Sequence, residues 1–128
     1  MQKNIILSMH QPFWLMIAMG RKKLELRTTK PKGDIPFKVY VYVTGGVGIV
    51  GEFVCNNVQE IHTVDDCVKA EKPSCVKANS IFAYTQYGKR KIYAWNISNV
   101  KVYRKPLMVS EFGLKRAPQT WQYMEEAN

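Results

Sequence analysis

The sequence has 128 residues, of which 46% are hydrophobic and 23% are charged, a balance that excludes a disordered or low-complexity chain. This length suits one domain with its own core, so we expect a single domain over residues 1–128. No apolar run approaches the roughly 20 residues of a membrane-spanning helix, and the N-terminus lacks the features of a signal peptide.

Charge is strongly and unevenly positive. The chain carries 19 basic and 10 acidic residues, giving a net charge of +9. Residues 20–38 and 89–116 are basic, whereas residues 52–71 are acidic. Such a distribution predicts a polyanionic partner, with a charge that serves only solubility as the alternative.

The cysteine pattern predicts reduced thiols and a cytoplasmic location. There are three cysteines, no CxxC motif and no secretory signal. Together with His62, the residues Cys67 and Cys75 could be imagined as zinc ligands, but their spacing is not standard and a fourth ligand is missing. We therefore expect no metal and no cofactor.

Residues 5–27 are the stretch around which the chain is organised. Residues 5–7 form an apolar run typical of a buried strand. Pro12 suits the first position of a helix, and Gly20 suits the position after its end. The helix between them, over 12–19, has no polar group except an indole, so we expect it to be mostly buried. In the strand over 23–27, charged and leucine side chains alternate, so one face is charged.

The middle of the chain predicts a hairpin. Residues 37–43 form a strand with valines on the core face and tyrosines half exposed. The glycines of residues 45–51 match the dinucleotide pattern GxGxxG, but the next residues alternate as a strand and no helix follows. A hairpin turn is the better interpretation.

The second half of the chain predicts short helices and further strands. Thr63 is the expected N-cap of a helix over 64–72 that ends before Pro73, and residues 58–62 only lead into it. Residues 74–80 can start another helix, and 81–87 fit either a helix end or a strand. We expect further strands at 91–97, 100–103 and 121–124, and one helical turn at 109–112. The pattern is mainly β with short helices (α+β), typical of a small β-barrel of about five to six strands.

Ordered motifs along the chain resemble those of the ASCH domain, a relative of the PUA RNA-binding fold. The characteristic set is Leu7-Ser8-Met9-His10-Gln11-Pro12, followed by Gly20, Lys22, Glu25 and Arg27. Residues 28–32, 36–40, 50–53, 106, 110–112 and 117–121 are similar to the small bacterial and prophage ASCH proteins. The resemblance implies a PUA-like barrel with the first helix over one opening, and a cleft below that helix for a nucleotide or RNA segment.

The resemblance puts Lys22, Glu25 and Arg27 at the centre of that cleft. Arg27 offers a planar fork for a phosphate or a base edge, and Lys22 offers a point charge. Glu25 could hold the Lys22 ammonium or accept a hydrogen bond from an exocyclic amine. Without the resemblance, the alternative is a solvated strand face with an ion pair of little energetic value.

Six further residues are candidates for the same cleft. Ser8, His10 and Gln11 would enter from the N-terminal side of the helix, although His10 can instead be a hydrogen-bonding residue at the helix entry. Trp121 could stack on a base or close one end of the barrel. The remaining candidates are Lys30, in an exposed loop, and Thr44, at the end of a strand.

Two functions follow from these residues. The leading one is a nucleic-acid-binding module, for RNA or a nucleotide, without turnover. The alternative is a small hydrolase acting on RNA or on a modified nucleoside, similar to the ASCH branch that hydrolyses acylated cytidine. The lysine of that branch corresponds to Lys22, but the position of its threonine is occupied by Glu25. Catalytic residues are therefore unassigned, with Lys22 and Glu25 as candidates.

Overall fold

The computed structural model describes residues 4–124, which contain eight strands, three helices and one 3-10 turn. In chain order these are β1 (Asn4–Met9), α1 (Gln11–Ala18), β2 (Leu24–Arg27), β3 (Phe37–Val43), β4 (Gly48–Cys55), β5 (Val58–Ile61), α2 (Val64–Ser74), α3 (Ala78–Tyr84), β6 (Ile92–Asn96), β7 (Ser98–Leu107), the turn Val109–Phe112 and β8 (Trp121–Tyr123). The expected mainly β domain with short helices is confirmed.

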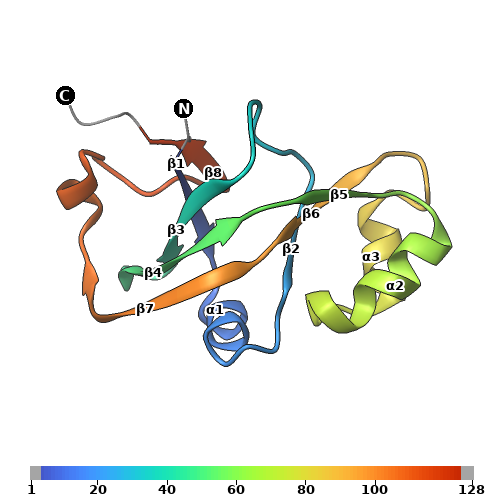
Figure 1. Cartoon of the computed structure of the whole chain (residues 1–128), viewed down its shortest axis with the longest axis horizontal. Helices are drawn as coiled ribbons and strands as arrows, with labels where there is room; N and C mark the ends of the chain where they lie inside the picture. The colour runs from blue at the N-terminus through green and yellow to red at the C-terminus, as the bar shows by residue number, and fades with distance from the viewer. Residues whose placement is uncertain (1–3, 125–128) are drawn as a thin grey trace.

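The larger sheet has five strands in the order β7-β4-β3-β1-β8 (Figure 1). The β1–β3 pair is parallel and the other pairs are antiparallel. Along β3, alternate residues from Phe37 to Val43 are buried and the tyrosines are half-buried, which confirms the predicted faces. The hairpin predicted at the glycines is also confirmed, because β3 and β4 pair across that turn.

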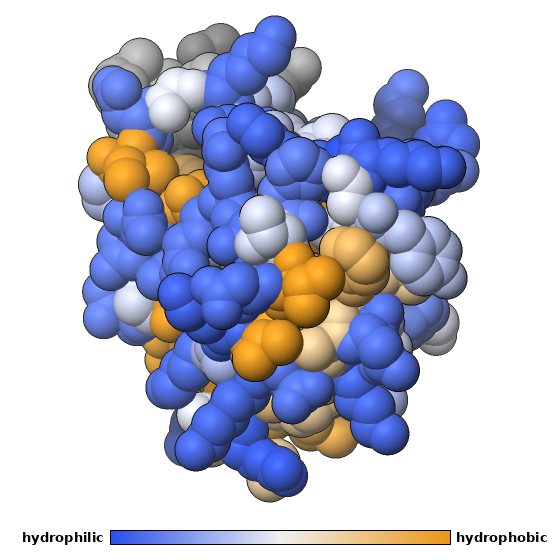
Figure 2. Space-filling model, turned by 90° about the vertical axis from the view of Figure 1, so that its right-hand side faces the viewer, coloured by the Kyte–Doolittle hydropathy of each residue, from blue (hydrophilic) through white to orange (hydrophobic). Residues whose placement is uncertain are grey.

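The smaller sheet, in the order β2-β6-β5, is packed with α2 and α3 (Figure 1). Its own apolar cluster includes Leu24, Ile61 and Ile92 of the strands and Ala70 and Ile81 of the helices. Hydrophilic residues cover most of the face that α2 and α3 present, around a small apolar group (Figure 2). None of the helices in the part described is long and apolar enough to cross a membrane.

Helix α1 is less buried than expected. Only Trp14 and Ile17 are buried, whereas Leu15 is 47% and Met19 is 67% exposed. A helix of two turns that packs on one side buries one stripe only, and its apolar composition does not reveal the open side. The helix lies at one end of the five-stranded sheet (Figure 1), where Trp14 packs into the main core cluster.

Two other expectations need correction. Helix α2 continues through Pro73 to Ser74, because a proline in the last turn leaves most of the helical hydrogen bonds intact. Residues 58–61 form the strand β5, which shows no apolar alternation and is defined by its pairing with β6. The eight strands form two sheets, and although no pairing among residues 4–124 closes a barrel, this does not contradict the predicted mainly β fold with short helices. The helix predicted to start within 74–80 is present as α3, and it extends to Tyr84, so the first part of 81–87 is a helix end and not a strand.

Candidate functional site

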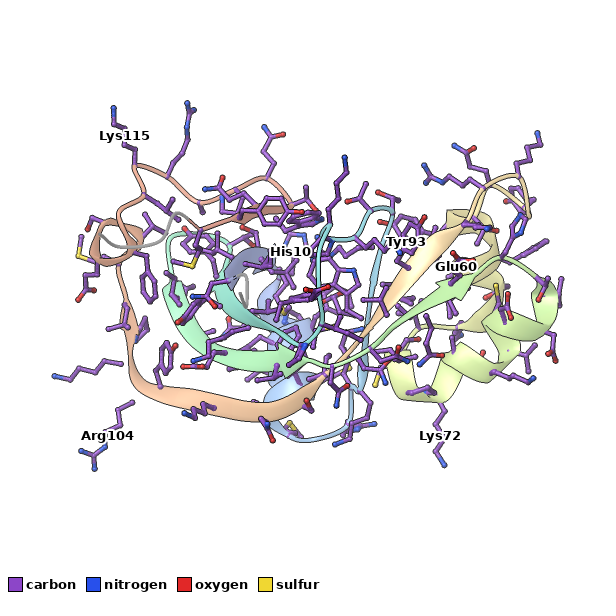
Figure 3. The ribbon with its side chains drawn as sticks, turned by 45° about the horizontal axis from the view of Figure 1, so that its top comes forward. His10, Glu60, Lys72, Tyr93, Arg104 and Lys115 are labelled. Carbon is purple, nitrogen blue, oxygen red and sulfur yellow. The ribbon has the colours of Figure 1, made fainter. Side chains whose placement is uncertain are left out.

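A cleft of about 680 Å³ lies where the end of β1, the start of α1, the charged face of β2 and the helix α3 meet. His10, at the junction of β1 and α1, lies near the middle of the molecule (Figure 3). Its lining includes Ser8, His10, Phe13, Lys22, Glu25, Arg27, Thr44, Tyr84 and Gln119. Six of the nine predicted site residues therefore share one cavity.

Lys22 is buried in the cleft wall, with only 2% of its surface exposed. Its Nζ donates a hydrogen bond of 2.6 Å to the carbonyl oxygen of Ser74, in the last turn of α2, and lies 5.5 Å from the centre of the Phe13 ring. Burial lowers the pKa of Lys22, and the nearby Glu25 carboxylate opposes this shift. An ammonium has three N–H donors, so Lys22 retains donors for a ligand.

Arg27 is held by the protein on two sides. Its Nη1 donates to Thr120 Oγ1 at 3.0 Å and its Nη2 donates to the carbonyl oxygen of Ser8 at 2.9 Å. Its Nε lies 3.9 Å from Oε1 of Glu25, a long ion pair. These contacts fix the orientation of the guanidinium in the cleft.

Glu25 pairs with Arg27 and not with Lys22, contrary to one expectation. Residues two apart on a strand share a face, whereas Lys22 precedes β2 and lies beside Ser74. Among the described residues, Glu25 Oε2 and Arg27 Nε are the buried side-chain atoms without a hydrogen-bond partner. The alternative of a solvated strand face is excluded, because Glu25 is only 7% exposed.

The segment before β8 closes one side of the cleft. Ser8 Oγ donates to the carbonyl oxygen of Pro118 at 2.6 Å, so this hydroxyl has a structural partner. Gln119, between this contact and the Arg27–Thr120 contact, lines the cleft. His10 Nδ1 and Thr44 Oγ1 share a hydrogen bond of 3.0 Å in an exposed part of the lining.

Three predicted site residues lie outside the cleft lining. Gln11 is exposed at the start of α1. Lys30 lies over the ring of Tyr93, 5.4 Å from its centre. Trp121 packs edge-on against Trp95 and donates to Thr29 Oγ1 at 2.9 Å, which matches its alternative role of closing the structure.

Sequence reasoning missed the contributions of Phe13, Gln119 and α3. Tyr84 belongs to the stretch that fitted both helix and strand, so nothing in the sequence placed it beside β2. Gln119 lies within a motif that carried the resemblance, and that position was the available signal.

No protein-family model and no curated protein sequence gives a significant match to the chain. Solved structures of ASCH from Zymomonas mobilis do match. The structure of ASCH without a named mutation is 17% identical to this chain, with a TM-score of 0.79 over 97% of this chain and 89% of that one. A tyrosine-to-phenylalanine mutant of the same protein is 16% identical, with a TM-score of 0.80 over 98% and 92%. A serine-to-alanine mutant is 17% identical, with a TM-score of 0.81 over 98% and 90%. The chain therefore has the fold of the ASCH protein, as the resemblance of its motifs predicts.

Proposed function

We propose that residues 1–128 are a single ASCH module that binds single-stranded RNA, with one nucleotide of the strand in the cleft. The observation that carries this proposal is the pair of buried atoms without partners, Glu25 Oε2 and Arg27 Nε, in a cavity of about 680 Å³. The volume lies in the range of small-ligand sites. The aromatic rings of Phe13 and Tyr84 line the same cavity and can contact a base.

The net charge of +9 supports a polyanion as the ligand. Basic side chains are spread around the molecule: Lys72 of α2, Arg104 of β7 and Lys115 extend outward from separate parts of the surface (Figure 3). A spread of this kind attracts the phosphates of a flexible strand without reading its sequence. Selectivity would then belong to the cleft.

Titration with short single-stranded RNA at about 50 mM and about 200 mM salt tests the binding proposal. If three or more phosphates are contacted, counterion release should weaken binding by roughly tenfold or more over this range. An oligomer of the same sequence with an uncharged backbone is the matched control, and its weaker binding should not depend on salt. An RNA affinity that stays constant across the salt range would contradict the proposal.

A second function, hydrolysis of a modified nucleoside or of RNA, is favoured by the burial of Lys22. Its lowered pKa increases the fraction of neutral amine, the form that can act as a base. The position matches the lysine of the acylcytidine-hydrolysing branch that the motifs resemble, whereas Glu25 replaces the threonine. Incubation with acylcytidines and single-stranded RNA, followed by mass spectrometry, separates the two functions. Products that disappear in Lys22→Met would favour hydrolysis, and unchanged substrates would favour binding alone.

A further inference from the structure

The turn between α3 and β6, residues 85–91, has an unusual backbone (Figure 1). Gln86 and Tyr87 both have a φ of 56°, and Gly88 follows with a φ of 85°. Left-handed angles are costly for a residue with a Cβ atom, and strained positions of this kind cluster at functional sites. The side chains that this turn presents are therefore candidates for a function.

Hydrogen bonds hold this turn in one conformation. The buried Thr85 hydroxyl donates to the carbonyl oxygen of Phe82 at 2.5 Å and accepts from the Gly88 N–H at 2.9 Å. The Tyr87 N–H donates to the same Phe82 carbonyl oxygen at 3.0 Å. His62 Nε2 donates to the carbonyl oxygen of Gly88 at 2.7 Å. A turn that is fixed before a ligand binds loses little conformational entropy on binding.

The turn holds an aromatic ring out into solvent. Tyr87 is 71% exposed, more than any other large apolar or aromatic residue in the described part of the chain. Its ring meets the Phe82 ring edge-on, with the centroids 6.0 Å apart and the planes at 85°. An edge-on contact covers at most one face of the Tyr87 ring and leaves the other open. A flat, exposed and fixed ring is a surface on which a base can stack.

The same segment is basic and adjoins the cleft. Lys89 is exposed, and its side chain has no hydrogen bond or ion pair in the described part of the chain, whereas Lys91 pairs with Glu60 at 3.2 Å. Arg90 lies over the ring of Tyr84, 5.7 Å from its centre, and donates through Nε and Nη2 to the Tyr84 carbonyl oxygen. Tyr84 itself lines the cleft, so it links the cleft wall to the turn.

We infer that the turn between α3 and β6 is a second binding site for single-stranded RNA, where a base stacks on Tyr87 and the adjoining phosphate pairs with Lys89. This inference rests on the proposed binding of a nucleotide in the cleft, and Tyr84 marks the side from which the strand leaves it. Stacking on an aromatic ring tolerates every base. The turn should therefore add affinity without adding sequence preference.

Substitutions of Tyr87 test the stacking contact. Tyr87→Leu removes the ring but keeps a large apolar side chain, and Tyr87→Phe, the matched control, keeps the ring. Tyr87→Leu should weaken the binding of mixed-sequence RNA octamers by about fivefold to a hundredfold, the value of stacking one base. Tyr87→Phe should stay within about twofold of the wild type, because the stacking face is retained. Circular dichroism checks that both variants are folded.

An octamer with one base at its centre and abasic sugars elsewhere gives an independent test. It keeps the phosphates and a base for the cleft, but it has no second base to stack. The wild type should bind it more weakly than the complete octamer, and Tyr87→Leu should weaken it no further. An equal effect of Tyr87→Leu on the two octamers would overturn the stacking contact.

The charge of the turn has its own test. Lys89→Gln should reduce the slope of log affinity against log salt by about one, because one phosphate contact is lost. Lys115→Gln is the control, because it removes the same charge from a side chain that extends outward at the other end of the molecule (Figure 3). Its slope should equal that of the wild type. Equal slope changes in the two variants would overturn the assigned path of the strand.

The outcomes distinguish the second site from the cleft. Octamer binding by a folded Tyr87→Leu that equals wild-type binding would overturn the second site and leave the proposed binding in the cleft standing. A failure of the wild type to bind any octamer at low salt would overturn both proposals.

Discussion

Replacing Lys22 with methionine is expected to weaken the binding of single-stranded RNA octamers by roughly tenfold to a hundredfold, the value of a charge-assisted hydrogen bond. Methionine is of similar length and is unbranched, so it fills the volume that the 2% exposed lysine occupies. The domain should therefore remain folded, which circular dichroism checks. Lys23→Met removes the same charge from an exposed neighbouring position and should change the affinity far less.

The pH dependence of the RNA affinity is a second test of the role of Lys22. Burial lowers the pKa of Lys22 from its ordinary value of 10.5, so its positive charge is lost at a lower pH than in an exposed lysine. Wild-type affinity should fall as the pH rises through this lowered pKa, whereas the affinity of Lys22→Met should lack this step. Oligomers with 2′-O-methyl sugars tolerate the alkaline conditions.

The free energy of unfolding should change with pH in the direction opposite to the RNA affinity. Between the lowered pKa and 10.5, the unfolded chain holds the Lys22 proton more often than the folded chain does. The free energy of unfolding of the wild type should therefore rise with pH relative to that of Lys22→Met. Parallel pH profiles for the two proteins, or equal losses of affinity in Lys22→Met and Lys23→Met, would contradict the assigned role of Lys22.

Replacing Gly51 with alanine is expected to lower the free energy of unfolding by about 3 kcal/mol, the upper part of the range for overpacking a core. A Cβ atom there would lie 2.5 Å from Cη2 of Trp14, and closer still to the carbonyl oxygen of Lys101. Backbone and a buried indole cannot both move away cheaply. Gly51 therefore allows α1, and with it the wall of the cleft, to pack against β4.

Urea unfolding measures this effect, and Gly46→Ala is its matched control. Gly46 has a φ of +79° and open space around its Cα, so alanine there should cost only about 1 kcal/mol of backbone strain. An equal or smaller cost at Gly51 would show that the close approach of Trp14 does not position α1. The two variants also separate the turn from the strand within the glycine motif that resembles a dinucleotide loop.

How much of the fold follows from the sequence depends on whether each element carries a local pattern. The strand from Phe37 to Val43 alternates clearly and was predicted with its bounds and faces. The strand β5 has only two apolar residues among four, and its structure comes from pairing with β6, which no local pattern reports. The exposure of Leu15 and Met19 likewise depends on where α1 sits, because composition alone cannot distinguish a buried side from an open one.

The site residues of one motif were predicted from the sequence. The parts of the site where distant segments meet were not. Lys22, Glu25 and Arg27 lie close together in sequence, so their convergence in one cleft follows from the motif. One of the two roles predicted for Glu25, holding the Lys22 ammonium, was wrong, because Lys22 instead bonds to Ser74, 52 residues away in the chain. Contacts at such separations depend on how α2 and α3 pack against the smaller sheet.

The central claim is that a nucleotide of single-stranded RNA sits in the cleft between α1, β2 and α3. Heteronuclear NMR of the isotope-labelled protein, titrated with a single-stranded RNA octamer, locates the bound strand most directly. We expect the largest shift changes at the cleft residues Phe13, Lys22, Arg27 and Tyr84, with the Arg27 Nε–H signal moving as it gains an acceptor. Shift changes confined to the outward basic side chains, such as Arg104 and Lys115, with the cleft signals unmoved, would contradict the claim.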